Sequence, residues 1–222
     1  MRTFHHISTA LAVGLLVAGC ADDPEGLTGG TSGDPGGLPG TGTPVGPIVG
    51  TKPTEPPPPA TKTWAAQTLA RAREWIAAEM PYCGGPNGGK DLICGGTCER
   101  AGTAKKAEWD KYRSDCSGFV SWSWGLPPPG RVTSTLAPFD TTASTLIEVD
   151  QLMPGDALNN DGHVMLFGGW VDQDKGTATI LQESRCDTVA SEKTATFTKV
   201  NETTLKISDG RTFRTIRYKG AK

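Results

Sequence analysis

The amino-acid sequence predicts an α+β domain in which N-terminal helices pack on an antiparallel β-meander. Apolar residues recur at helical spacing after position 64, and short alternating segments separated by turn residues follow after position 156. Helices that precede strands, with no internal repeat, indicate one core rather than a series of βαβ units. A domain over residues 63–222 is long enough to bury such a core.

Residues 1–19 have the pattern of an export signal. Arg2 supplies a positive start, and Ile7–Ala18 forms an apolar segment that is too short to span a membrane. The ending Leu16–Cys20 resembles the lipobox of bacterial lipoproteins, which implies cleavage before Cys20 and lipid on its thiol. The alternative is an ordinary secretory signal with a chance cysteine. In both cases we expect an exported protein; with lipid, it is anchored to a membrane and faces the periplasm or the cell exterior.

Residues 20–62 are rich in Gly, Pro and Thr and include four successive prolines, Pro56–Pro59. Such a segment cannot bury enough apolar surface to fold, so we interpret it as a tether. It carries five acidic residues and two lysines, within a chain of formal net charge −2. The predicted folded part is therefore near neutral, and nothing in it suggests a nucleic-acid partner.

The first half of the domain contains three predicted elements. Ala65, Leu69, Ala72, Ile76 and Met80 share one helical face, with Thr63 as cap and Pro81 as terminator. A glycine-rich loop over Tyr82–Glu99 follows, and Ala101–Tyr112 is expected to form a polar helix. A short buried helix then begins near Cys116 and stops before Gly125 and Pro127.

The second half predicts strands. Pro127–Val149 is interpreted as a long connection, and Pro154–Asp156 as a tight turn into a strand. His163–Trp170 alternates, with His163, Met165 and Phe167 on one face, and Gly176–Glu183 returns beside it. Two further strands are expected over Lys193–Val200 and Thr212–Tyr218.

Five cysteines follow Cys20, and an exported chain tends to oxidise its thiols. Four of them are expected to form two disulfides in one of three connectivities; these are Cys83, Cys94, Cys98 and Cys186. We expect the fifth, Cys116, to remain a thiol. A zinc site is the alternative, but one histidine among residues 20–222 makes it the weaker one, so no metal and no other cofactor is predicted.

Cys116 and His163 are the candidate nucleophile and base. A helix N-terminus favours the thiolate form of a cysteine. A nucleophilic thiol needs a base, and His163 is the only histidine outside the predicted signal. The structural alternatives are a buried cysteine that packs a helix start and a histidine without a catalytic role.

Hairpin register predicts the group that orients the base. If Trp170 pairs with Gly176, then His163 pairs with Glu183 on the same face. A carboxylate there could fix the tautomer of the imidazole. A shift of one residue would offer Gln182 instead, and Glu183 could also be only a charge at a strand end.

The segment Asp115–Val120, followed by Pro154–Asp156 and Gly162–Val164, resembles the motifs of the NlpC-type cell-wall cysteine peptidases, which are related to the CHAP amidases. Pro81–Gly85 resembles a weaker family motif that precedes the cysteine. The resemblance implies a papain-like fold, with Cys116 as nucleophile and His163 as base. It also implies that Tyr82 lines the oxyanion region and that Asp115 and Ser117 cap or orient the helix start.

The resemblance implies a lipid-anchored, monomeric hydrolase that cleaves an amide bond in a peptidoglycan stem peptide through a thioester. Two departures put the cleaved bond in doubt. The family's third residue is often a second histidine, and an insertion over Lys90–Arg113 is unusual. The alternatives are a CHAP-like N-acetylmuramoyl-L-alanine amidase, an acyltransferase with the same dyad, and a non-catalytic wall-binding lipoprotein.

Overall fold

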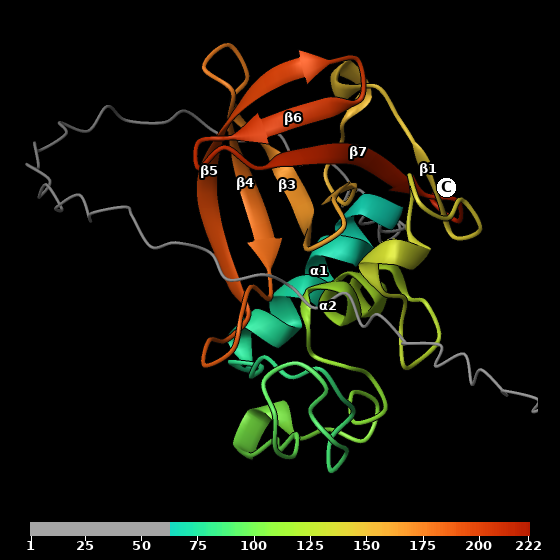
Figure 1. The fold of residues 1–222 in the computed structure, drawn as a ribbon, viewed down its shortest axis with the longest axis vertical. Helices are drawn as coiled ribbons and strands as arrows, with labels where there is room; N and C mark the ends of the chain where they lie inside the picture. The colour runs from blue at the N-terminus through green and yellow to red at the C-terminus, as the bar shows by residue number, and fades with distance from the viewer. Residues whose placement is uncertain (1–62) are drawn as a thin grey trace, which may run out of the picture.

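The computed structural model describes residues 63–222. In this range six antiparallel strands close into a barrel: β2 (Ala157–Asn159), β3 (Val164–Asp172), β4 (Thr177–Gln182), β5 (Ser191–Asn201), β6 (Thr204–Ile207) and β7 (Thr212–Tyr218). The pairing of β6 with β7 closes the barrel, and β1 (Ser144–Leu146) extends the sheet beyond β7. Figure 1 shows these strands together, with the helices crossing one side of them.

The predicted papain-like α+β arrangement, with N-terminal helices packed on a β-meander, is wrong. Sheet dominates the described residues, which hold only two α-helices, α1 (Trp64–Ala77) and α2 (Cys116–Trp124). The strand order is also not a meander, because β7 lies between β1 and β2. Barrel closure and the insertion of β7 depend on pairings between distant segments, which local patterns do not reveal.

Capping residues flank the two α-helices. The Thr63 side chain accepts a hydrogen bond from the Ala66 amide, and Asp115 caps α2 in the same way. Gly125 ends α2 in the left-handed conformation, with a φ of 72°, which glycine adopts without strain. The polar helix expected over Ala101–Tyr112 does not form; only a short 3-10 turn, Gly102–Ala104, occurs there.

Two apolar clusters lie on opposite sides of the sheet. The helix-side cluster contains Trp75 and Phe119 from the helices and Val164, Leu166 and Leu181 from the strands. The second cluster fills the barrel, where it includes Met165, Phe167, Ile180, Ala195 and Phe213. Alternation along β3 and β4 therefore assigns each successive side chain to one cluster or the other.

The loop region over residues 82–114 lies beyond the helices, farthest from the barrel (Figure 1). Two disulfides hold it: Cys83–Cys98 within the loop, and Cys94–Cys186, which joins it to the segment after β4. These are the four cysteines that the sequence predicts to be bridged. Neither α-helix within residues 63–222 is long and apolar enough to cross a membrane. The predicted signal, Cys20 and the tether lie outside the described residues.

Candidate functional site

Asp115 organises the start of α2. Its Oδ1 accepts hydrogen bonds from the Gly118 amide at 2.6 Å and from the Ser117 hydroxyl at 2.9 Å. Its Oδ2 forms an ion pair with Arg113 Nε at 2.9 Å, and Arg113 also donates to the carbonyl oxygen of Arg131. Asp115 and Ser117 therefore fix the helix start that carries Cys116. Sequence analysis missed Arg113, although a cation two residues before a buried acid is a usable signal.

Close packing against the backbone requires a glycine at position 118 of this motif. A Cβ atom at this position would collide with the Arg113 carbonyl, which is backbone and cannot move aside. The chain between Arg113 and the helix must therefore run directly against residue 118. The glycine of the Asp115–Val120 segment is thus required by the local fold, whatever the chemistry of Cys116.

Cys116 is buried, with 1 % of its surface exposed, and it is disulfide-bonded. The other four cysteines of the described range pair with one another. The prediction that Cys116 remains a thiol is therefore wrong for this structure. A disulfide sulfur carries no thiolate, so Cys116 cannot act as a nucleophile until that bond is opened.

His163 lies directly before β3, at the end of a tight turn. Asn160 Oδ1 accepts from the amides of Gly162 at 2.9 Å and His163 at 2.7 Å, which holds the turn in place. The imidazole is buried and meets the Phe213 ring edge to face, with centroids 6.3 Å apart. The turn and the ring contact together fix where the imidazole points.

The two ring nitrogens of His163 have different surroundings. Nε2 lies 2.9 Å from Gln182 Oε1, whereas Nδ1 has no hydrogen-bond partner among residues 63–222. A carbonyl oxygen can only accept, so this contact places the proton on Nε2 and leaves the lone pair on Nδ1. The imidazole is therefore held in the tautomer that a general base at Nδ1 requires.

Burial lowers the pKa of His163 from 6.5 to about 4. The bond to Gln182 and the charge of Asp209 act in the opposite direction, and the charge of Lys193 adds to the lowering. The ring is thus neutral at neutral pH. A neutral imidazole can accept a proton. The predicted role of His163 as a general base requires this neutral state.

Gln182, rather than Glu183, serves the imidazole, which corrects the predicted third residue. Leu166 pairs with Leu181, and Trp170 pairs with Ala178 rather than with Gly176. An irregularity between Phe167 and Gly169 shifts the ladder, so that Gln182 shares the barrel face with His163. The sequence analysis also offered Gln182, through a one-residue shift that would set it directly opposite His163. The ladder continued from Leu166 and Leu181 instead sets Gln182 opposite Met165, so Gln182 reaches the imidazole diagonally.

Glu183 instead faces the helix side. Its carboxyl group is fully buried, and burial and then the charge of Asp115 raise its pKa well above the usual value, while the charge of Arg100 opposes them. Neither oxygen has a hydrogen-bond partner within the described range. The nearby Ala190 amide, which lowers the pKa of Glu183 slightly, donates its hydrogen bond to Met80 O.

Cys116 and His163 are not brought into a hydrogen bond. Cys116 belongs to the helix-side cluster, together with Tyr82 and Val164, whereas His163 contacts Phe213 of the barrel cluster. Helix α2 does pack on β3 and β4, and His163 directly precedes β3. Tyr82 is buried in the helix-side cluster, and its backbone amide donates to Thr188 O.

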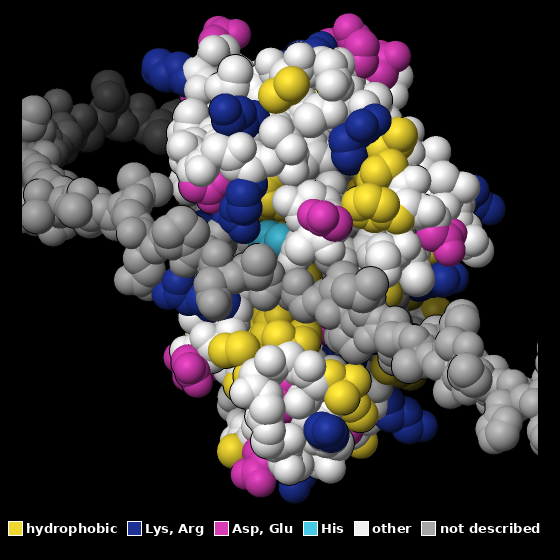
Figure 2. All heavy atoms as spheres, in the orientation of Figure 1, with side chains coloured by type: hydrophobic (Ala, Val, Ile, Leu, Met, Phe, Trp, Pro, Cys, Tyr) yellow, Lys and Arg dark blue, Asp and Glu magenta, His cyan; other side chains and the backbone are white. Residues whose placement is uncertain are grey.

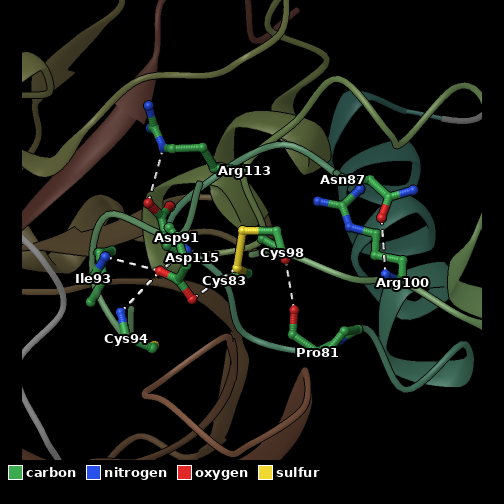
Figure 3. The surroundings of a disulfide bond; sticks show 12 residues. Pro81, Cys83, Asn87, Asp91, Ile93, Cys94, Cys98, Arg100, Arg113 and Asp115 are labelled. Atoms are coloured by element: carbon green, nitrogen blue, oxygen red, sulfur yellow. Dashed lines mark hydrogen bonds and ion pairs between the residues drawn. A yellow bond between two sulfur atoms is a disulfide. The ribbon is translucent and has the colours of Figure 1, made fainter. Parts of the chain in front are cut away.

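Within residues 63–222, the side chains whose ligand atoms lie close enough together to hold a metal ion are those of Cys83, Asp91 and Cys98. The two sulfurs are bonded to each other, so they cannot serve as thiolate ligands. Figure 3 shows Asp91 turned toward the backbone of its own loop, where Oδ1 accepts from the amides of Gly84, Ile93 and Cys94. Asp91 thus organises the disulfide-bonded loop.

A groove of about 690 Å³ adjoins Gln182. The segment after β4, β5 and the turn between β6 and β7 form its walls, and its charged lining residues are Arg185, Asp187, Lys193, Asp209 and Arg211. Sequence analysis missed these residues, because they come from three separate segments and form no local motif. Figure 2 shows basic and acidic side chains dispersed over the visible face, which agrees with the near-neutral charge.

Comparison of the chain with family models, with curated proteins and with solved structures gives no match.

Proposed function

We propose that the protein is a cell-wall cysteine hydrolase, with His163 as the general base and Gln182 as the residue that orients it. One observation carries the proposal: a buried, neutral imidazole donates from Nε2 to Gln182 and leaves its Nδ1 without a partner. A structural histidine usually satisfies both nitrogens when it is buried. The unsatisfied Nδ1 therefore favours a role in proton transfer.

In the proposed reaction, Nδ1 of His163 takes the proton of the Cys116 thiol, and the thiolate attacks the carbonyl carbon of an amide. The imidazolium returns that proton to the departing amine as the C–N bond breaks. Water, deprotonated by the same nitrogen, then cleaves the thioester and restores the thiol. Gln182 remains neutral throughout and holds the ring, while the backbone amides at the start of α2 face the developing oxyanion.

The reaction requires the thiol form of Cys116. We therefore propose that reduction of the Cys116 disulfide by a dithiol gives the active form.

The motif resemblance supplies the substrate class, an amide in a peptidoglycan stem peptide. Either an endopeptidase or an amidase agrees with a groove beside Gln182 that has polar and charged walls. A second candidate is a non-catalytic wall-binding lipoprotein. The disulfide-bonded state of Cys116 and the lack of a hydrogen bond between Cys116 and His163 favour that candidate.

Digestion of purified peptidoglycan tests the proposal. The protein is incubated with and without a dithiol reductant, alongside its Cys116→Ala and His163→Asn variants, and new termini are identified by mass spectrometry. We expect reductant-dependent cleavage, which Cys116→Ala abolishes and His163→Asn slows by about 100-fold or more, the usual contribution of a general base.

The products separate the candidates. New amino-acid termini within stems indicate an endopeptidase, and release of whole stems indicates an amidase. Because the reductant also acts on the two other disulfides, reduced Cys116→Ala is the matched control. Equal binding of peptidoglycan by all forms, with no cleavage by the reduced wild type, would establish the binding protein instead.

A further inference from the structure

Lys193 shares a face of the sheet with the imidazole and its partner. In the β4–β5 ladder, Lys193 lies opposite Ile180, and Ser191 lies opposite Gln182. Ile180 belongs to the barrel cluster, so alternation places Lys193 on the side that carries Gln182. The Lys193 side chain accordingly lines the groove that adjoins Gln182.

The charge of Lys193 reaches the imidazole. Lys193 is among the groups that lower the pKa of His163, which requires the ammonium group to lie near the ring. Lys193 is exposed, and no carboxylate within residues 63–222 forms an ion pair with it. A cation therefore stands beside a neutral base without a counter-ion from this part of the protein.

The acids of the groove do not meet this cation. Asp209 is held by Arg211, with Oδ2 at 3.0 Å from Nε and 2.6 Å from Nη2. Asp187 lies on the exposed segment after β4, next to Cys186, which its disulfide anchors to the loop region. The groove therefore offers a positive position near the imidazole, separate from the paired charges of Asp209 and Arg211.

We propose that Lys193 binds a carboxylate of the peptide substrate and selects peptides with a free carboxylate over amidated ones. This inference rests on the proposed hydrolase and deepens it, because Lys193 acts on the same groove as Gln182. An ammonium group donates to a carboxylate in a charge-assisted hydrogen bond, whereas a carboxamide offers only a neutral acceptor. Lys193 is thus a specificity residue, and the proton transfers remain with His163.

The test compares two forms of one substrate. Purified stem peptides are used with free carboxylates and after carbodiimide-mediated amidation, and both are given to the reduced wild type and to Lys193→Met and Lys193→Arg. We expect Lys193→Met to raise KM for the free carboxylate about tenfold, the effect of losing one charge-assisted hydrogen bond. The KM for the amidated peptides and kcat for both should stay unchanged, and Lys193→Arg should restore most of the preference.

Lys206→Met is the matched control. Lys206 is an exposed lysine of the same barrel on β6, between Leu205 and Ile207, which point into the barrel, and it does not line the groove. We expect no change of KM from this variant. An equal effect of Lys193→Met on both peptide forms, or no effect on either, would overturn the inference while the hydrolase stands.

A binding measurement separates the two proposals. Titration of the Cys116→Ala variant with the two peptide forms reports affinity without cleavage. Weaker binding of the free carboxylate when Lys193→Met is added, with no cleavage by the reduced wild type, would reject the hydrolase and keep the carboxylate site. Equal binding of both forms, or no binding of either, would reject the carboxylate site.

Discussion

Gln182 and Glu183 are neighbours in the chain, yet they lie on opposite faces of the sheet and in opposite electrostatic surroundings. Gln182 faces the barrel, where its neutral carboxamide accepts from a neutral imidazole. Glu183 faces the helices, where its carboxyl group lies near Asp115 and Arg100 and neither oxygen has a hydrogen-bond partner in the described range. One face joins two uncharged groups, and the other buries a carboxyl whose ionised form is unfavourable.

The difference shows that strand register, rather than residue type, decides which side chain can serve the imidazole. Carboxylates are the more frequent partners of catalytic histidines, and one lies a single residue away. A carboxylate in the position of Gln182 would favour the imidazolium, whereas the carboxamide keeps the ring neutral. Experiments on the disulfide beside these residues, and on each residue in turn, test this comparison.

The largest effect is expected from the disulfide that joins the helix-side loop to the segment after β4. Cys94–Cys186 links the helix-side loop to the segment after Glu183 and spans 92 residues, whereas Cys83–Cys98 spans 15. Chain-entropy arguments give about 4 to 5 kcal/mol for the longer loop and about 3 kcal/mol for the shorter one. Denaturant unfolding of the two double Cys→Ser variants should therefore show the greater loss for Cys94 and Cys186.

Equal losses from the two disulfides would contradict this expectation. They would mean that the segment after β4 holds its position without the covalent link. The groove wall beside Asp187 would then depend on packing and hydrogen bonds, such as that from Tyr82 N to Thr188 O.

The second prediction concerns pH and the barrel face. The pKa of His163 is about 4 in the fold against 6.5 as the reference, so the unfolded chain binds this proton more tightly. The stability from this group is complete above pH 6.5 and is lost as the pH falls toward 4. The loss should be about 3 kcal/mol, measured as the free energy of unfolding across that range.

His163→Asn is the control for this pH effect, because it removes the titrating group. The variant should lose less stability than the wild type between pH 6.5 and pH 4. A wild type and a variant that decline in parallel would show that other groups account for the acid sensitivity.

The third prediction tests the partner of the imidazole. Gln182→Leu removes the only acceptor of Nε2 and leaves a buried donor unsatisfied, which should cost about 2 kcal/mol of unfolding free energy. Gln182→Glu restores an acceptor and adds a charge, so the pKa of His163 should rise, which NMR titration of the imidazole would detect. An unchanged imidazole titration in both variants would show that Gln182 does not control the ring.

The sequence predicted the parts of the fold that local residues determine. Thr63 caps the first helix, although that helix ends at Ala77, before the predicted terminator Pro81. Asp115 and Gly125 bracket the second helix, and the strand over Thr212–Tyr218 has the bounds that the alternation indicates. These features depend on caps, terminators and a period of two, all visible within a few residues.

The parts that the sequence did not predict depend on distant contacts. Pairing of β6 with β7 closes the barrel, and β1 pairs with β7 across about 70 residues of chain. The irregularity between Phe167 and Gly169 changes the register, which places Gln182 rather than Glu183 on the face of the imidazole. The disulfide bond of Cys116 was also not predicted, because a count of cysteines does not show which of them pair.

The smallest effect is expected at Glu183, and its sign is opposite to that at Gln182. Burial raises the pKa of Glu183, so its contribution to stability is present below pH 4.5 and is lost as the pH rises. Glu183→Gln keeps the shape and removes the ionisable group, and we expect it to stabilise the fold at pH 7 by about 1 kcal/mol. The gain should shrink toward pH 4, where the wild-type carboxyl is protonated in both states.

Glu99→Gln provides the matched control for this last substitution, because Glu99 is exposed and should change stability by less than about 0.5 kcal/mol. A loss of stability in Glu183→Gln at pH 7 would mean that the carboxylate is ionised and that its attraction to Arg100 outweighs both burial and the repulsion from Asp115. The helix face would then be held by a buried ion pair. The contrast would then be one between a neutral hydrogen-bonded pair, His163 and Gln182, and a charged pair, Glu183 and Arg100.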